Sequence, residues 1–213
     1  SYNDHIYKIG QGSIRRSDHK YYFREKLDGE IANKFGKFPI VILEGNTYSG
    51  KTRAAYEFMR NQEEWKDWNF HIYNSNHCVK NLNDIRLNCT ERSNGDVYLI
   101  DDINDIICKQ DAQIDRSGNT IWNKLNGYNK DNGFSLQDMG RTRIIITISG
   151  RLSEGDRFSI YNSIFNVQGD RAIQKIKQDI VIDFDQPDRK SFHEMVDNMV
   201  RDGVIKKSVV IKG

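Results

Sequence analysis

Apolar residues gather in short runs that are separated by polar segments, and several runs have the length of a single strand. In residues 38–44 (FPIVILE) the apolar positions continue without interruption from Pro39 to Leu43. Residues 70–75 (FHIYNS) and 97–100 (VYLI) form further runs. Short, unbroken runs with β-branched residues are typical of strands that are covered on both faces of a parallel sheet.

Helical periodicity follows the first strand and returns near the end of the chain. Residues 53–62 (RAAYEFMRNQ) and 192–200 (FHEMVDNMV) each place apolar side chains on one helical face. In the first segment these are Ala54, Ala55, Phe58 and Met59. Strands that alternate with helical segments predict an α/β fold with a parallel sheet.

The turn between the first strand and the first helix has the pattern Gly-x-x-x-x-Gly-Lys-Thr. Such a pattern arises by chance in about one of a hundred chains of this size, and a simple glycine turn is the alternative. The strand–loop–helix setting favours a phosphate-binding loop, because glycines let backbone N–H groups surround an anion. The predicted nucleotide-binding residues are Gly45, Asn46, Thr47, Tyr48, Ser49, Gly50, Lys51, Thr52 and Arg53.

Two carboxylates, Asp101 and Asp102, follow the strand at residues 97–100. The carboxyl end of a parallel strand is where an α/β sheet holds its ligand. Asp101 is the candidate for holding Mg²⁺ through water, together with the hydroxyl of Thr52. Asp102 is the candidate for polarising the attacking water. An acidic turn after a buried strand is the alternative interpretation.

The order of the remaining segments resembles that of AAA+ and STAND-type ATPases, which belong to the additional-strand group of P-loop proteins. Residues 100–133 resemble the stretch from the Walker B motif through the next helix. Residues 141–151 (RTRIIITISGR) resemble the following strand, which ends at a polar sensor residue, and residues 178–200 resemble the fifth strand and the first lid helix. The resemblance covers residues 38–203.

This resemblance implies a three-layer αβα sandwich with a five-stranded parallel sheet in the order 5-1-4-3-2. It implies at most the start of a helical lid. We therefore expect an arm at residues 1–20, a nucleotide-binding core at residues 21–186, and a lid start or truncated segment at residues 187–213. ATP or ADP with Mg²⁺ are the implied cofactors.

The resemblance also implies catalytic roles for Lys51, Asp102, Ser149 and Arg171. Asp102 stands where most AAA+ motors have Glu, and a shorter side chain reaches water less easily. Thr147 or Ser149 is placed to donate a hydrogen bond to phosphate, although a serine–glycine turn closing a strand is the alternative. Arg171 lies nearest the position of an arginine finger. Arg151, Arg157 and Arg171 have the alternative interpretation of solvated surface charges.

Composition adds little to this picture. The chain has 213 residues with 32 Lys and Arg against 30 Asp and Glu, so its charge singles out no partner. We expect no membrane association, because no apolar run approaches the length of a membrane helix. Its three cysteines, Cys78, Cys89 and Cys108, lack metal-ligand spacing, and we expect a reducing, cytoplasmic location.

Three functions remain open from the sequence. The first is an ATP-hydrolysing AAA+ module that forms a homo-oligomer and remodels an unidentified protein or nucleic-acid partner. The second is a STAND-like regulatory switch with slow or no hydrolysis. The third is a small-molecule phosphotransferase, which is disfavoured because the chain has no arginine cluster resembling a kinase lid.

Overall fold

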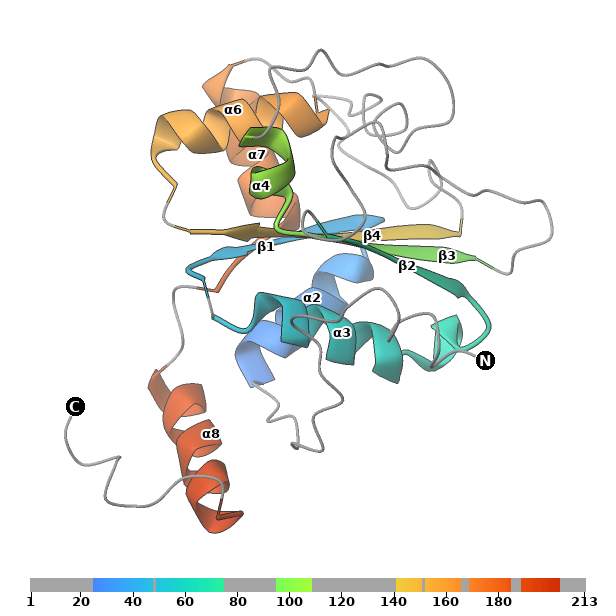
Figure 1. The fold of residues 1–213 in the computed structure, drawn as a ribbon, viewed down its shortest axis with the longest axis vertical. Coiled ribbons are helices and arrows are strands. Elements are labelled where there is room, and N and C mark those ends of the chain that lie inside the picture. The colour runs from blue at the N-terminus through green and yellow to red at the C-terminus, as the bar shows by residue number, and fades with distance from the viewer. Residues whose placement is uncertain are drawn as a thin grey trace.

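A single five-stranded sheet, parallel throughout, forms the centre of the molecule (Figure 1). The computed structural model describes residues 25–47, 49–74, 95–108, 141–150, 152–165, 169–184 and 189–203. The strand order is β2-β3-β4-β1-β5, so the predicted order 5-1-4-3-2 is confirmed. The strands are β1 (Ile40–Gly45), β2 (Asn69–Asn74), β3 (Asp96–Asp101), β4 (Thr142–Ser149) and β5 (Val181–Asp183).

Helices cover both faces of this sheet, which confirms the three-layer sandwich. In Figure 1, α2 and α3 lie on one face and α4, α6 and α7 lie on the other, while α8 lies apart from the sheet. The bounds are α2 (Glu25–Phe35), α3 (Lys51–Asn61), the 3₁₀ turn η1 (Glu63–Trp65), α4 (Ile103–Cys108), α6 (Glu154–Phe165), α7 (Asp170–Ile180) and α8 (Arg189–Arg201). Within the described residues, no helix is both long and apolar enough to cross a bilayer.

Side-chain alternation along β1 divides the core into two halves. Ile40 and Ile42 pack with α6 and α7, whereas Val41 and Leu43 pack with α2 and α3. All six residues of β1 are buried. This is why residues 40–43 are apolar without polar alternation: a strand in the middle of a covered sheet has no face toward water.

The helix after β1 begins at Lys51, two residues before the predicted start. Its buried face includes Ala54, Ala55 and Met59, as the periodicity predicts. Phe58 is partly buried and stacks on Phe35 at a ring separation of 5.4 Å. The apolar stripe of α3 therefore fixes the helix against the sheet and against α2, and this packing holds the preceding loop in place.

Parallel pairing brings the ends of distant strands to one edge. Gly45 of β1 lies opposite Ser149 of β4, and β3 ends beside β4 at Asp101. The carboxyl edge of the sheet thus holds the glycine of the predicted phosphate loop, the predicted metal-binding carboxylate and the predicted sensor residue. The predicted arm at residues 1–20, Tyr48, Arg151 and residues 204–213 lie outside the described residues.

Candidate functional site

The loop between β1 and α3 is held by a glycine in a left-handed conformation. Gly50 caps the start of α3 with φ 88° and ψ 15°. A side chain is strained at such a φ, which explains the glycine at this position of the motif. Inside the loop the Ser49 N–H donates to the Asn46 carbonyl at 3.1 Å, and the Ala54 N–H donates to the Gly50 carbonyl at 2.9 Å.

Lys51, the first residue of α3, turns its side chain back over the loop. Its ammonium donates to the carbonyl oxygens of Gly45 at 2.9 Å and Asn46 at 2.7 Å, and to the hydroxyl of Ser49 at 3.2 Å. Only 3% of the residue is exposed. A buried ammonium on a flexible stem at the mouth of a loop can exchange these oxygens for those of a phosphate.

Asp101 is the centre of a buried hydrogen-bond cluster. The hydroxyl of Thr52 donates to its Oδ1 at 2.7 Å, and the hydroxyl of Thr147 donates to the same oxygen at 2.7 Å. Hydroxyl and carboxylate oxygens are the hard ligands that Mg²⁺ prefers. Among the described residues no group of three or more His, Cys, Asp or Glu gathers around one point.

Asp102 occupies a strained turn directly after β3. Its φ is 51°, and its backbone N–H donates to the hydroxyl oxygen of Thr147 at 2.8 Å. Its carboxylate accepts a short hydrogen bond from the hydroxyl of Ser149. The N–H of Ser149 in turn donates to Oδ1 of Asn104 at 3.0 Å. The single hydroxyl proton of Thr147 goes to Asp101 and that of Ser149 goes to Asp102, so both predicted phosphate donors give their protons to carboxylates here.

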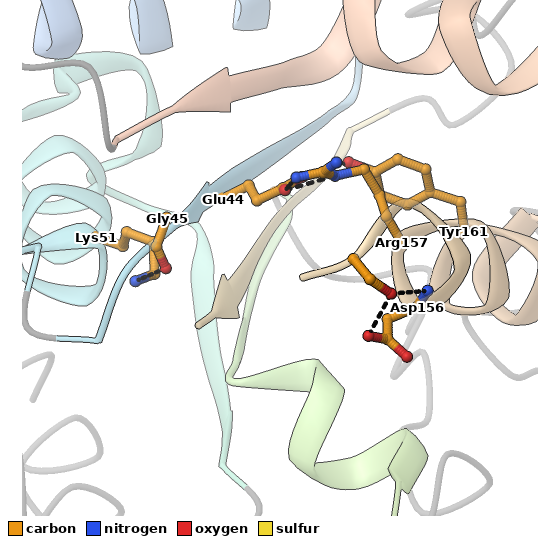
Figure 2. A network of polar contacts seen from close by, with 7 residues as sticks. Glu44, Gly45, Lys51, Asp156, Arg157 and Tyr161 are labelled. Carbon is orange, nitrogen blue, oxygen red and sulfur yellow. Dashed lines mark hydrogen bonds and ion pairs between the residues drawn. The ribbon is translucent and has the colours of Figure 1, made fainter. Parts of the chain in front are cut away.

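A third polar network binds β1 to α6 immediately before the loop (Figure 2). Arg157 donates through Nε to Oε1 of Glu44 at 2.6 Å and also contacts that oxygen through Nη2. The hydroxyl of Tyr161 donates to Oε2 of Glu44 at 2.7 Å. Figure 2 shows the side chain of Glu44 directed toward α6, while Gly45 at the end of β1 and Lys51 at the start of α3 lie on either side of the loop.

The environment of Glu44 shifts the pKa values of both partners. The hydrogen bond from Arg157 to the carboxylate raises the pKa of the guanidinium. Burial, followed by the adjacent negative charge of Glu44, raises the pKa of the Tyr161 hydroxyl far above its ordinary value. Arg157 is therefore a permanent cation and Tyr161 a permanent donor at neutral pH.

The side chain of Ser153 caps the start of α6, the helix that carries Arg157. The hydroxyl of Ser153 accepts the N–H of Asp156 at 3.1 Å and donates to Oδ2 of Asp156 at 2.6 Å. Figure 2 includes these bonds at the start of the helix. The first of these bonds satisfies one of the N–H groups that the first turn of a helix leaves without partners.

Other predicted residues lie away from these clusters. Arg53 forms an ion pair with Glu57 one turn along α3, at 2.5 Å. Arg171 is exposed in the first turn of α7, and within the described part of the chain its side chain has no hydrogen bond or ion pair. Thr47 is exposed in the loop. The roles predicted for Arg53, Thr47 and Arg171 stay predictions.

The structure corrects the interpretation of Arg157 and adds residues that the sequence did not single out. Arg157 is not simply a solvated surface charge, because it pairs with the buried Glu44. Glu44, Tyr161 and Asn104 also take part in the networks around the loop. Only Glu44 carried a signal, since a charged residue within a run of buried strand positions requires a partner.

Comparisons with known proteins give limited help. The chain matches no protein-family model, and no curated protein sequence is similar to it. Among solved structures, the crystal structure of Cdc6p from Pyrobaculum aerophilum is similar, with a TM-score of 0.48 and 12% identity. The match covers 90% of this chain and 52% of that one, so the chain spans about half the length of Cdc6p. This likeness is too distant to assign a family or an activity.

Proposed function

We propose that this chain is a nucleotide-binding module of the AAA+ kind, which binds ATP or ADP with Mg²⁺ at residues 45–52. One observation carries the proposal. The hydroxyl of Thr52, directly after the glycine–lysine pair, bonds to Asp101 at 2.7 Å from a position 49 residues away in the chain. The two sequence motifs, each ambiguous alone, therefore supply adjacent parts of one polar cluster.

Each residue has a distinct role in this proposal. The N–H groups of the loop and the N-terminus of α3 attract the phosphates, and Lys51 donates to the β- and γ-phosphate oxygens. Thr52 and Asp101 hold the metal, Asp101 through water. The metal neutralises the charge that gathers on the phosphates. Asp102 orients the attacking water, and Ser149 lies beside it as a polar group toward the γ-phosphate.

A STAND-like switch with slow turnover is the second candidate, and a specific contact favours it. The carboxylate of Asp102 accepts the hydroxyl proton of Ser149. A base engaged in this bond is a weaker acceptor for a proton from water, and Asp is one methylene shorter than Glu. Slow hydrolysis would leave the bound nucleotide as a long-lived signal.

The decisive experiment measures ATP binding and turnover per subunit against protein concentration. Lys51→Ala should weaken ATP binding by on the order of 100-fold, since a buried, charge-assisted donor to phosphate is lost. Lys66→Ala is the matched control, because Lys66 forms an exposed ion pair with Glu63, and their side chains are 64% and 87% exposed. Unchanged ATP affinity in Lys51→Ala would refute the site.

Turnover separates the two candidate functions. A rate per subunit that rises with concentration indicates a homo-oligomer whose site is completed between subunits, and Arg171→Ala should then lower it. Tight binding with no turnover at any concentration indicates the switch. Asp102→Asn should spare binding and stop any hydrolysis, and a variant that retains the parent rate would remove Asp102 from catalysis.

A further inference from the structure

One buried hydroxyl joins the two carboxylate residues at the end of β3. Thr147, which is 0% exposed, donates to Oδ1 of Asp101 at 2.7 Å. The hydroxyl oxygen of Thr147 also accepts a hydrogen bond from the backbone N–H of Asp102 at 2.8 Å. The Thr147 hydroxyl is thus engaged both as a donor, to Asp101, and as an acceptor, from Asp102.

The hydrogen bond from the Asp102 N–H to Thr147 stabilises an unusual backbone conformation at Asp102. Asp102, with φ 51°, is the one non-glycine residue of positive φ in the described part of the chain. Left-handed conformations are unfavourable for residues with a side chain and persist where surrounding contacts hold them. Thr147 supplies such a contact to the backbone, while Ser149 holds the carboxylate of the same residue.

The hydrogen bond from Thr147 to Asp101 is part of a chain of contacts that joins three elements, β4, β3 and α3. Thr147 of β4 donates to Asp101 of β3, and Asp101 accepts the hydroxyl of Thr52 from α3. A hydroxyl oxygen that gives its proton to a carboxylate keeps its lone pairs for another ligand. The direction of the Thr52 lone pairs therefore depends on where Asp101 is held, and Thr147 is one of the groups that hold it.

We propose that Thr147 is a positioning residue for the metal-binding pair Thr52 and Asp101. This inference rests on the proposed function, because it concerns Mg²⁺ bound with the nucleotide. Thr147 itself touches neither nucleotide nor metal, since it is fully buried and its proton is committed to Asp101. Loss of the Thr147 hydroxyl should therefore change how ATP affinity depends on Mg²⁺, and it should leave the affinity for ATP without Mg²⁺ nearly unchanged.

The test is an ATP titration by calorimetry, with Mg²⁺ varied and with EDTA. Thr147→Val keeps the shape of the side chain and removes the hydroxyl. It should raise the Mg²⁺ concentration that gives half of the maximal increase in ATP affinity by about 10–100-fold. The affinity in EDTA should stay within about twofold. Thr147→Ser restores the hydroxyl and should return the Mg²⁺ dependence to within about threefold of the parent.

Thr142→Val is the matched control. Thr142 lies at the opposite end of the same strand and is also buried, at 8% exposure. Its variant should keep the parent Mg²⁺ dependence. Should Thr147→Val fail to fold, Thr147→Cys takes its place, because a thiol has similar shape and is only a weak donor.

Two outcomes would overturn the inference. Parent-like Mg²⁺ dependence in Thr147→Val would show that the Thr147 hydroxyl is not required to position Asp101 for Mg²⁺ binding. Equal loss of affinity with and without Mg²⁺ would show a general structural defect. If the parent chain itself binds no ATP, the proposed function fails together with the inference, and this result is recognised before any variant is compared.

Discussion

Two buried carboxylates, Glu44 on β1 and Asp101 on β3, differ in the groups that donate hydrogen bonds to them. Glu44 on β1 is 7% exposed and accepts hydrogen bonds from the guanidinium of Arg157 and the hydroxyl of Tyr161. Asp101 on β3 is 3% exposed and accepts the hydroxyls of Thr52 and Thr147. Both are acidic residues at or near the carboxyl end of a parallel strand.

The kind of donor separates an architectural role from a ligand-binding role. A guanidinium brings a permanent positive charge that compensates a carboxylate, so the Arg157 pair fastens α6 to β1. Hydroxyls orient a carboxylate and add no net charge. The two threonines orient the carboxylate of Asp101 without adding a positive charge of their own. An acidic residue at a strand end acquires its function from its donors as well as from its place on the sheet.

The largest expected effect is the loss of folding stability when the Glu44 network is broken. Arg157→Met leaves Glu44 buried without its cation and should lower the free energy of unfolding by about 3 kcal/mol, as measured in urea. Lys66→Met is the control, since an exposed pair contributes about 0.5 kcal/mol or less. Similar losses in both variants would mean that Glu44 and Arg157 form no more than a surface contact.

The next effect concerns Asp101. Asp101→Asn keeps an oxygen for the two hydroxyls but removes the charge, so Mg²⁺ affinity in the presence of ATP should fall about 10–100-fold. Without Mg²⁺, its free energy of unfolding should fall by much less than that of Arg157→Met. Calorimetry and urea unfolding of both variants give the comparison, and a large stability loss in Asp101→Asn alone would reverse the assigned roles.

The smallest effect appears at high pH. Burial raises the pKa of Tyr161 above its ordinary value of 10.0. The stability due to its protonated hydroxyl is therefore complete below about pH 10 and is lost as pH rises from there toward the folded-state pKa. Tyr161→Phe lacks this titration. Above about pH 10, the parent should lose about 1 kcal/mol more per pH unit than the variant.

Urea unfolding of the parent and Tyr161→Phe between about pH 8 and pH 11 measures this difference. Parallel curves would show that Tyr161 ionises equally in the folded and unfolded chain. That result would place the Glu44 network in a wetter environment than its burial indicates.

Local pattern predicted β1, β2, β3, α3 and α8, whereas β4 and β5 were expected from the family resemblance. The strand predicted at residues 97–100 is β3, which extends by one acidic residue at each end, Asp96 and Asp101. Hydropathy ends a strand at its first charged residue, whereas the backbone of β3 remains paired with β2 at both Asp96 and Asp101. The helix at residues 192–200 is confirmed within α8. The sheet order came from the family resemblance, because periodicity alone does not rank strands in space.

The site was predictable where its residues follow strands and not where side chains meet across the fold. The adjacency of Thr52 and Asp101 follows from strand ends sharing one edge. The pairing of Arg157 with Glu44 spans 113 residues, and no local pattern marks it. The left-handed turn at Asp102 was equally hidden, since Asp occupies ordinary turns too.

The position of β1 has a consequence for how the chain folds as it is synthesised. Ile40 pairs with Ile144 of β4, and Ile42 pairs with Val181 of β5, which are 104 (144 − 40) and 139 (181 − 42) residues later. At ribosomal rates the second neighbour follows β1 by roughly 7–28 s. Until then an apolar strand that carries the phosphate loop waits without its partners. The candidate loop is thus synthesised well before the strands that complete the sheet around it.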